Sequence, residues 1–435
     1  MTDPGFLRRA ELPLALGLVV LAAVWARQIQ VFQVFRYWDA DEYFLTAQQF
    51  ASGEAITAAA PYAYRVLTPW LVSRCCSDLQ QGFLLLNLAA GAALALLLVV
   101  WLRHFISHAG VRLLMVAAFA LQWHAPIRFV FYYPAYVDPW FQVFLLAALI
   151  AGERLVSRPT LVAGLSYVVL TVVGTLARET MLMVPAAGLL GALAARRTHG
   201  TTAWLWPARA LITGLVAFAA VYLALTGARA GYGFVDAVWL HLTNKPIESI
   251  ALAWFIAFGP MVAVVVYDWR STRDFLKGRL DLAALPLLCI GLAYVGGHDT
   301  ERYLFWSMPV VYLLIAQSLE RHQRLVAAPA IAVLLIAGQI LSQRVFWPVP
   351  SPGNAVTPLS DASGRPSQIY AVLNRVFVID DFHWNLWTNF GSRPFHLVQL
   401  AFYVALSAVI IMLMQRRSIE PADRRYVRSV SQVTS

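Results

Sequence analysis

Residues 82–103 read Gly-Phe-Leu-Leu-Leu-Asn-Leu-Ala-Ala-Gly-Ala-Ala-Leu-Ala-Leu-Leu-Leu-Val-Val-Trp-Leu-Arg, an apolar run that ends at an arginine. A helix needs about twenty residues to cross the hydrocarbon core of a membrane. This run has that length, and similar runs recur along the 435 residues. The composition agrees, with 60% hydrophobic residues, 13% charged residues and a mean hydropathy of +0.64. These values exclude an ordinary soluble protein, which carries about 25% charged residues.

Apolar runs that could span a membrane occur about twelve times. They lie at 12–31, 82–102, 112–131, 136–152, 160–177, 180–196, 209–227, 249–268, 281–297, 303–319, 325–343 and 396–415. Two segments between them, about 32–81 and 344–395, are too long to be simple connectors. We therefore expect an all-α polytopic membrane protein, with residues 1–435 forming one integral membrane domain of about twelve spans.

Basic residues follow the alternation of these runs. If Arg8 and Arg9 lie in the cytoplasm, most of the 33 lysines and arginines fall in cytoplasmic loops or in the tail 416–435. This is the positive-inside rule, and it predicts that both termini are cytoplasmic in a cell inner membrane. The net charge of +10 then reflects topology and contact with anionic lipids, and no nucleic-acid partner is expected.

Acidic residues gather in the first outer loop, in the stretch Trp38-Asp-Ala-Asp-Glu-Tyr-Phe44. On a helix lying at the membrane interface, Asp39, Glu42 and Tyr43 share one face, while Asp41 points elsewhere. A carboxylate here could act as the general base for an incoming hydroxyl group. The three acids are therefore catalytic candidates. The alternative is an ordinary solvated acidic helix.

Arginines on the same side are candidates for binding a phosphate. Arg65 follows Tyr64 in an aromatic stretch at the membrane surface, where the alternative is an interfacial anchor. Arg178 and Glu179 occupy a tight outer turn, where the alternative is a structural ion pair between them. Arg302 ends the polar run His298-Asp-Thr-Glu-Arg302, in which Asp299 or Glu301 could orient it. The spacing of His298 and Asp299 is a weak metal signal.

Further candidates for substrate binding lie between the third and fourth spans: His124, Arg128 and Asp138. Asp138 directly precedes Pro139 at the start of an apolar helix, which favours N-capping of that helix. Weaker polar candidates occupy later outer loops, at Asp236, His241, Lys245, Asp380, Asp381 and His383. All these residues share one predicted face of the membrane, which favours a common site.

The outer motifs resemble those of the GT-C superfamily of polytopic glycosyltransferases. The matching residues are Asp39, Tyr43, Tyr64, Arg65, Leu67 and Pro69, together with the Ala-Arg-Glu turn at 177–179 and the Asp-x-x-Arg motif at 299–302. The resemblance implies a GT-C-like fold and a polyprenyl-phosphate sugar as donor, used on the outer face and usually with inversion. The acceptor would be an envelope lipid or glycan.

The resemblance also implies roles for individual residues. Asp39 would be the base with Asp41 in reserve, and Arg65 and Arg302 would hold the donor phosphate, with Arg178 as a third candidate. The chain departs from better-known members in carrying two acids near the motif position, which leaves the choice between them open. It shows no large soluble domain after the last span, which argues against the oligosaccharide-transferring branch. Paired acids could bind a divalent metal, but we expect no required cofactor.

Two other classes fit the same topology. A transporter or lipid flippase often has twelve spans with both ends inside, but its ionisable residues would lie near mid-membrane and its halves would show symmetry. An O-antigen ligase or polymerase would depend on the late outer loop, where Arg375 and His383 are suitable residues.

The predicted topology can be tested with a reporter enzyme fused after Leu79. We expect the reporter to lie outside the cytoplasm, because the first span carries the chain from the Arg8–Arg9 side to the opposite side. A cytoplasmic readout would overturn the alternation on which the shared face depends.

Overall fold

A computed structural model describes residues 4–26, 39–199, 205–231, 238–240, 242, 245–297, 299–343 and 393–433. Within these ranges the chain is helical, apart from turns and one isolated parallel bridge between Ala59 and Arg229. The expected all-α class is confirmed for this part of the chain.

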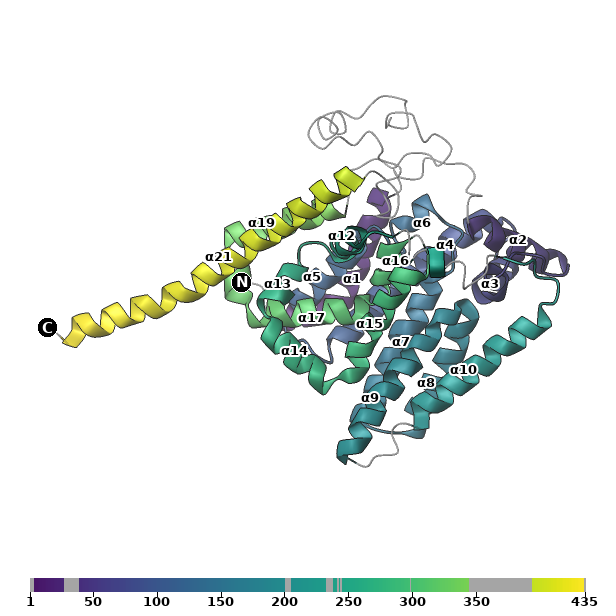
Figure 1. Ribbon diagram of the computed structural model, residues 1–435, viewed down its shortest axis with the longest axis horizontal. Coiled ribbons are helices and arrows are strands. Elements are labelled where there is room, and N and C mark those ends of the chain that lie inside the picture. Colours follow the sequence, from purple (N-terminus) through teal and green to yellow (C-terminus); the bar gives the residue numbers. More distant parts are fainter. Residues whose placement is uncertain are drawn as a thin grey trace, which may run out of the picture.

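The helices pack into one bundle, from which the C-terminal helix extends (Figure 1). In chain order they are α1 (Pro4–Ala26), α2 (Asp39–Ser52), η2 (Tyr62–Tyr64), α3 (Leu67–Cys75), α4 (Leu79–Leu102), α5 (Ala109–Leu121), α6 (Phe129–Tyr132), α7 (Asp138–Ser157), α8 (Leu161–Ala177), η3 (Glu179–Leu182), α9 (Met183–His199), α10 (Leu205–Ala224), α12 (Ile247–Phe258), α13 (Val262–Tyr267), α14 (Trp269–Gly278), α15 (Leu280–Val295), α16 (Thr300–Phe305), α17 (Met308–Arg321), α18 (Gln323–Val326), α19 (Pro329–Ser342) and α21 (Arg393–Val433).

Five described helices are long and apolar enough to cross a membrane: α1, α4, α7, α10 and α21. The bent pair α14–α15 would make a sixth. The other expected spans coincide with shorter or broken helices, so the count of twelve stays a prediction. The expected start of the tail at residue 416 has no counterpart in the backbone, because α21 continues as one helix to Val433.

The expected span 249–268 is broken by a turn between α12 and α13. Gly259 occupies this turn with φ +70°, in the left-handed region that favours glycine. A Cβ atom at this position would lie 1.9 Å from Oε1 of Gln339. Backbone conformation and close packing therefore both require glycine here, and the helix restarts at Val262.

Ion pairs gather at one end of the bundle around Glu11, which is fully buried in α1. Its carboxylate pairs with Arg103, 2.8 Å away at the end of α4, and with Arg112, 2.5 Å away in α5. At the same end, Arg279 pairs with Glu153 at 2.7 Å, which joins the start of α15 to the last turns of α7. We call this the Glu11 end. By the predicted alternation of spans, Arg103, Arg112 and Arg279 all fall on the side of Arg8 and Arg9.

The other end of the bundle carries α2, α3 and the first residues of α7, and we call it the site end (Figure 1). The helix α2 begins at Asp39, with its acids in the first turn, where carboxylates interact favourably with the helix dipole. It buries Ala40, Tyr43 and Ala47, which recur at helical spacing and face the bundle. The expected amphipathic helix is therefore present, and α3 follows it without having been anticipated.

Replacing Gly259 by alanine should lower the melting temperature, since the left-handed conformation and the contact with Gln339 both penalise a Cβ atom. We expect a loss of about 1–3 kcal/mol, measured by thermal unfolding of the purified protein. Gly291→Ala is the matched control, because nothing lies within 4 Å of a Cβ atom there. Equal melting temperatures for the two variants would contradict this explanation of the break.

Candidate functional site

Asp138 lies at the centre of the charged cluster at the site end. Its side chain is 2% exposed and forms an ion pair with Arg178. A second pair joins it to Arg302 at 3.4 Å, and the indole nitrogen of Trp306 donates a hydrogen bond to it at 3.3 Å. The N-cap prediction for Asp138 was wrong, because α7 is capped by Val137 and the carboxylate is used by these cations instead.

Arg178 and Glu179 do not pair with each other as the structural alternative expected. Arg178 has an extended backbone, with φ −162° and ψ 131°, so successive side chains point in opposite directions. The Arg178 guanidinium pairs with Asp138 and lies 4.5 Å from the ring centroid of Trp306. Glu179 turns instead to Arg65, which lies 114 residues away in the chain.

Arg65 is committed to two partners inside the protein. Its Nε and Nη2 atoms donate to the two oxygens of Glu179 at 2.9 and 2.6 Å, and Nη1 donates to the Tyr43 hydroxyl at 2.6 Å. Burial acts to raise the pKa of the Glu179 carboxyl, but Arg65 outweighs it and holds that pKa at about 2. The pair is therefore ionised, and it fixes η3 against the segment that follows η2.

Asp39 is held by a tyrosine from another part of the chain. The hydroxyl of Tyr133 donates to the Asp39 carboxylate at 2.5 Å and accepts from the Ala40 amide at 2.7 Å. The other carboxylate oxygen faces Nη2 of Arg302 at 3.8 Å. Asp39 is thus oriented toward the arginine cluster, as the shared-site prediction requires.

Arg302 has looser contacts than the other two arginines. Its nearest carboxylate belongs to Asp299 at 3.2 Å, followed by Asp138 at 3.4 Å and Asp39 at 3.8 Å. Its Nε atom has no hydrogen-bond partner among the described residues, although the residue is only 7% exposed. Four carboxylates face three guanidiniums in this cluster, counting the pair of Arg65 and Glu179, so each arginine already has a counter-ion.

Three predicted residues of the first outer loop have other surroundings. Glu42 pairs with Arg229 at 2.9 Å and accepts from the Ala59 amide at 2.6 Å, beside the Ala59–Arg229 bridge. Tyr64 packs against aromatic side chains of α10. Asp41 is exposed on α2. Glu42 therefore fastens the segment after α10 to α2, and its catalytic role stays a prediction.

Three further predicted residues are buried at the same end. His124 lies 3.8 Å from Glu301, and both side chains are 0% exposed. Arg128 donates to the backbone oxygens of Leu121 and Gln343 at 2.5 and 2.6 Å, and so caps the end of α5. Arg128 thus joins two backbone segments through Nη1, and its role in substrate binding stays a prediction.

Lys245 follows a similar pattern, donating to the backbone oxygens of Ala293 and Gly297 at 2.7 and 2.5 Å. Burial lowers the pKa of its ammonium group to about 8, against the opposing effect of the nearby acids Glu301 and Asp299. Several other predicted positions lie outside the described residues: His298, Asp236, His241, Arg375, Asp380, Asp381 and His383.

Two residues of the cluster, Tyr133 and Trp306, had no role predicted from the sequence. Tyr133 belongs to an aromatic run, and its partner Asp39 is 94 residues away. Trp306 meets Asp138 over a separation of 168 residues. No local spacing signals such contacts: Tyr133 falls between two predicted spans and Trp306 inside the predicted span 303–319.

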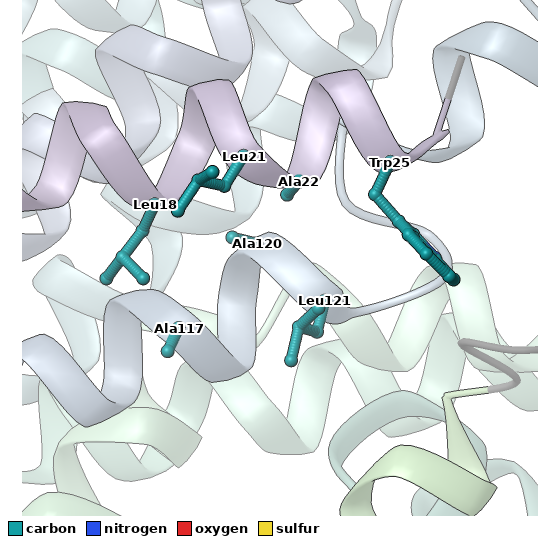
Figure 2. Close-up of a pocket in the computed structure, with 7 residues that line it drawn as sticks. All are labelled: Leu18, Leu21, Ala22, Trp25, Ala117, Ala120 and Leu121. Carbon is teal, nitrogen blue, oxygen red and sulfur yellow. The ribbon is translucent and has the colours of Figure 1, made fainter. Parts of the chain in front are cut away.

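An apolar cavity of about 240 Å³ lies between α1 and α5 (Figure 2). Its lining residues are Leu18, Leu21, Ala22, Trp25, Ala117, Ala120 and Leu121. The chemistry of this lining suits a hydrocarbon chain better than a sugar or a phosphate. None of the residues of the charged cluster lines it.

No protein-family model, curated protein or solved structure matches this chain. The GT-C resemblance therefore depends on its short motifs and stays a hypothesis. Within the described ranges, no three His, Cys, Asp or Glu side chains are grouped to hold a metal ion. The independence from metal also stays a prediction.

Replacing Asp138 by asparagine should destabilise the protein strongly, because it leaves Arg178 and Arg302 without their buried counter-ion. Breaking such a pair costs about 3–5 kcal/mol, which thermal unfolding would register as a large fall in melting temperature. Asp39→Asn is the comparison, since Asp39 is more exposed and meets Arg302 at a longer distance. The same fall for both variants would show that Asp138 has no special structural role.

Proposed function

We propose that the chain is a membrane glycosyltransferase that moves a sugar from a polyprenyl-phosphate donor to an envelope lipid or glycan. The observation that carries the proposal is the approach of Arg302 to Asp39, 3.8 Å apart at the site end. Sugar transfer needs a base for the acceptor hydroxyl and a cation for the leaving phosphate. A carboxylate and a guanidinium lying side by side support this chemistry. We assign this end to the outer face of the inner membrane.

The reaction that fits these groups is a single displacement. The acceptor oxygen attacks the anomeric carbon while the bond from that carbon to the phosphate oxygen breaks. The Asp39 carboxylate takes the proton of the acceptor hydroxyl. The polyprenyl phosphate leaves with the bonding electrons, and Arg302 stabilises its negative charge. One such displacement inverts the anomeric configuration.

Tyr133 supports the role of Asp39 as the base. Its hydroxyl bridges the Asp39 carboxylate and the Ala40 amide, and so fixes the carboxylate relative to the first turn of α2. One carboxylate oxygen then receives the Tyr133 hydrogen bond, while the other faces Arg302. A general base held in one orientation loses less entropy when it meets the acceptor.

The arginines differ in their readiness to bind a phosphate. Arg65 uses three donor groups on Glu179 and Tyr43, which suits a residue that braces the site. Arg302 meets its carboxylates at 3.2–3.8 Å and keeps its Nε atom without a hydrogen bond among the described residues. We therefore assign the donor phosphate to Arg302. Asp299, whose side chain is 26% exposed, is the carboxylate that solvent can most easily stabilise on release.

The proposal predicts separate effects for the base and the phosphate ligand. In a transfer assay with radiolabelled polyprenyl-phosphate sugars, Asp39→Asn should lower kcat by about 10²–10⁴. Arg302→Ala should raise the KM for the donor by about tenfold or more and leave the KM for the acceptor near normal. Arg302→Lys should restore part of the donor affinity, because it retains the charge.

Asp41→Asn makes the same chemical change on an exposed part of α2, and a larger loss of kcat in this variant than in Asp39→Asn would transfer the base role to Asp41. Near-normal turnover by Asp39→Asn would refute the base assignment, and equal KM effects on donor and acceptor would count against a phosphate ligand at Arg302. The transporter alternative predicts a different result. Proteoliposomes would then move a lipid-linked sugar across the bilayer without forming a new glycosidic bond.

A further inference from the structure

The short helix α14 lies at the Glu11 end and turns sharply away from α15. The two helices meet at an angle of 108°, with Arg279 between them. Figure 1 shows the bend between α14 and α15. Arg279 pairs with Glu153 and stacks 5.8 Å from the ring centroid of Phe105, just beyond the end of α4. If α15 crosses a membrane, α14 therefore runs nearly parallel to the membrane surface.

One face of α14 is fixed to the bundle. Thr272 is 1% exposed, and Phe275 and Leu276 pack against the main apolar core. The ring of Phe275 meets that of Phe105 edge to face, with centroids 6.2 Å apart. Just before the helix, Asp268 binds Arg321 at 2.6 Å. These contacts determine which face points outward.

The outward face is basic. Arg270, Arg273 and Lys277 are all exposed, and their spacing places them on one side of the helix. Asp274 is the acid on this face, and it pairs with Arg273 at 3.2 Å. Arg270 and Lys277 have no ion-pair partner in the part of the chain that the structure describes. The face thus carries a net positive charge, with exposed Arg324 on nearby α18.

Exposed apolar side chains adjoin this basic face. Trp269 is 55% exposed at the first residue of α14, and Val266 is 60% exposed just before it. At the other end of the helix, Leu280 is 44% exposed where α15 begins. A helix with basic residues beside tryptophan and aliphatic residues is typical of a membrane interface. An acidic soluble partner would bind the basic residues but would not bury these apolar side chains.

We propose that the outward face of α14 binds the head groups of anionic phospholipids at the Glu11 end of the bundle. Arg270, Arg273 and Lys277 bind the phosphates, while Trp269 enters the boundary between head groups and acyl chains. The bound lipid holds the turn between α13 and α15 at the membrane surface. This site is independent of the sugar-transfer chemistry, which lies at the other end.

Native mass spectrometry of the purified full chain can measure the binding of phosphatidylglycerol, with phosphatidylcholine as the neutral probe. The triple variant R270Q/R273Q/K277Q should weaken phosphatidylglycerol binding by about fivefold for each cation removed. The matched control is R74Q/R158Q/R209Q, which removes three exposed arginines of α3, the end of α7 and α10. This control should bind nearly as the unmodified chain does.

One further variant and one further measurement keep the test independent of folding. R270K/R273K retains the charge and should retain phosphatidylglycerol binding, and the melting temperature of each variant should stay close to that of the unmodified chain. Equal losses in the α14 variant and the control would overturn the proposal, because binding would then follow net charge alone. It would also fail if the unmodified chain bound both lipids equally, or bound poly-glutamate in place of phosphatidylglycerol.

Discussion

The burial of charge among apolar helices is the constraint on which the site end depends. Asp138 is nearly fully buried, and an unpaired carboxylate in such a place is too costly to persist. Arg178 at the end of α8, and Arg302 and Trp306 of α16 and its C-cap, satisfy it. Removing any one of these groups would leave a buried charge without its partner. Through these contacts, the first residue of α7 joins the end of α8 to α16.

The pairing of buried charges also determines what the cluster can do chemically. Arg65 is neutralised by Glu179, so its strongest interactions are internal. Arg302 instead shares three carboxylates at longer distances, and no single partner satisfies it. An incoming anion can compete more easily for such a cation than for one held bidentately. The proposed chemistry therefore centres on Arg302 and Asp39, with Arg65 in a bracing role.

The two ends of the bundle differ in how their charged residues are arranged. At the Glu11 end, the buried Glu11 carboxylate joins α1 to Arg103 and Arg112. The basic face of α14 is exposed at the same end. In the charged cluster at the site end, acids outnumber arginines, and these residues pair with one another inside the protein. This division agrees with the expected separation of topological arginines from motif residues. The proposed sugar-transfer site and the proposed lipid site therefore consist of separate residues at opposite ends of the bundle.

The sequence by itself determined the helical class, the position of most apolar helices and the grouping of the motif residues, since hydropathy and charge alternation are local properties. It also predicted one shared site for Asp39 and Arg302, which lie 3.8 Å apart. Only the tertiary structure decided the pairings, because Asp39 with Tyr133 and Arg65 with Glu179 are contacts between distant segments. The break at Gly259 likewise depends on Gln339 from another helix. Spacing along the chain carries no information about such partners.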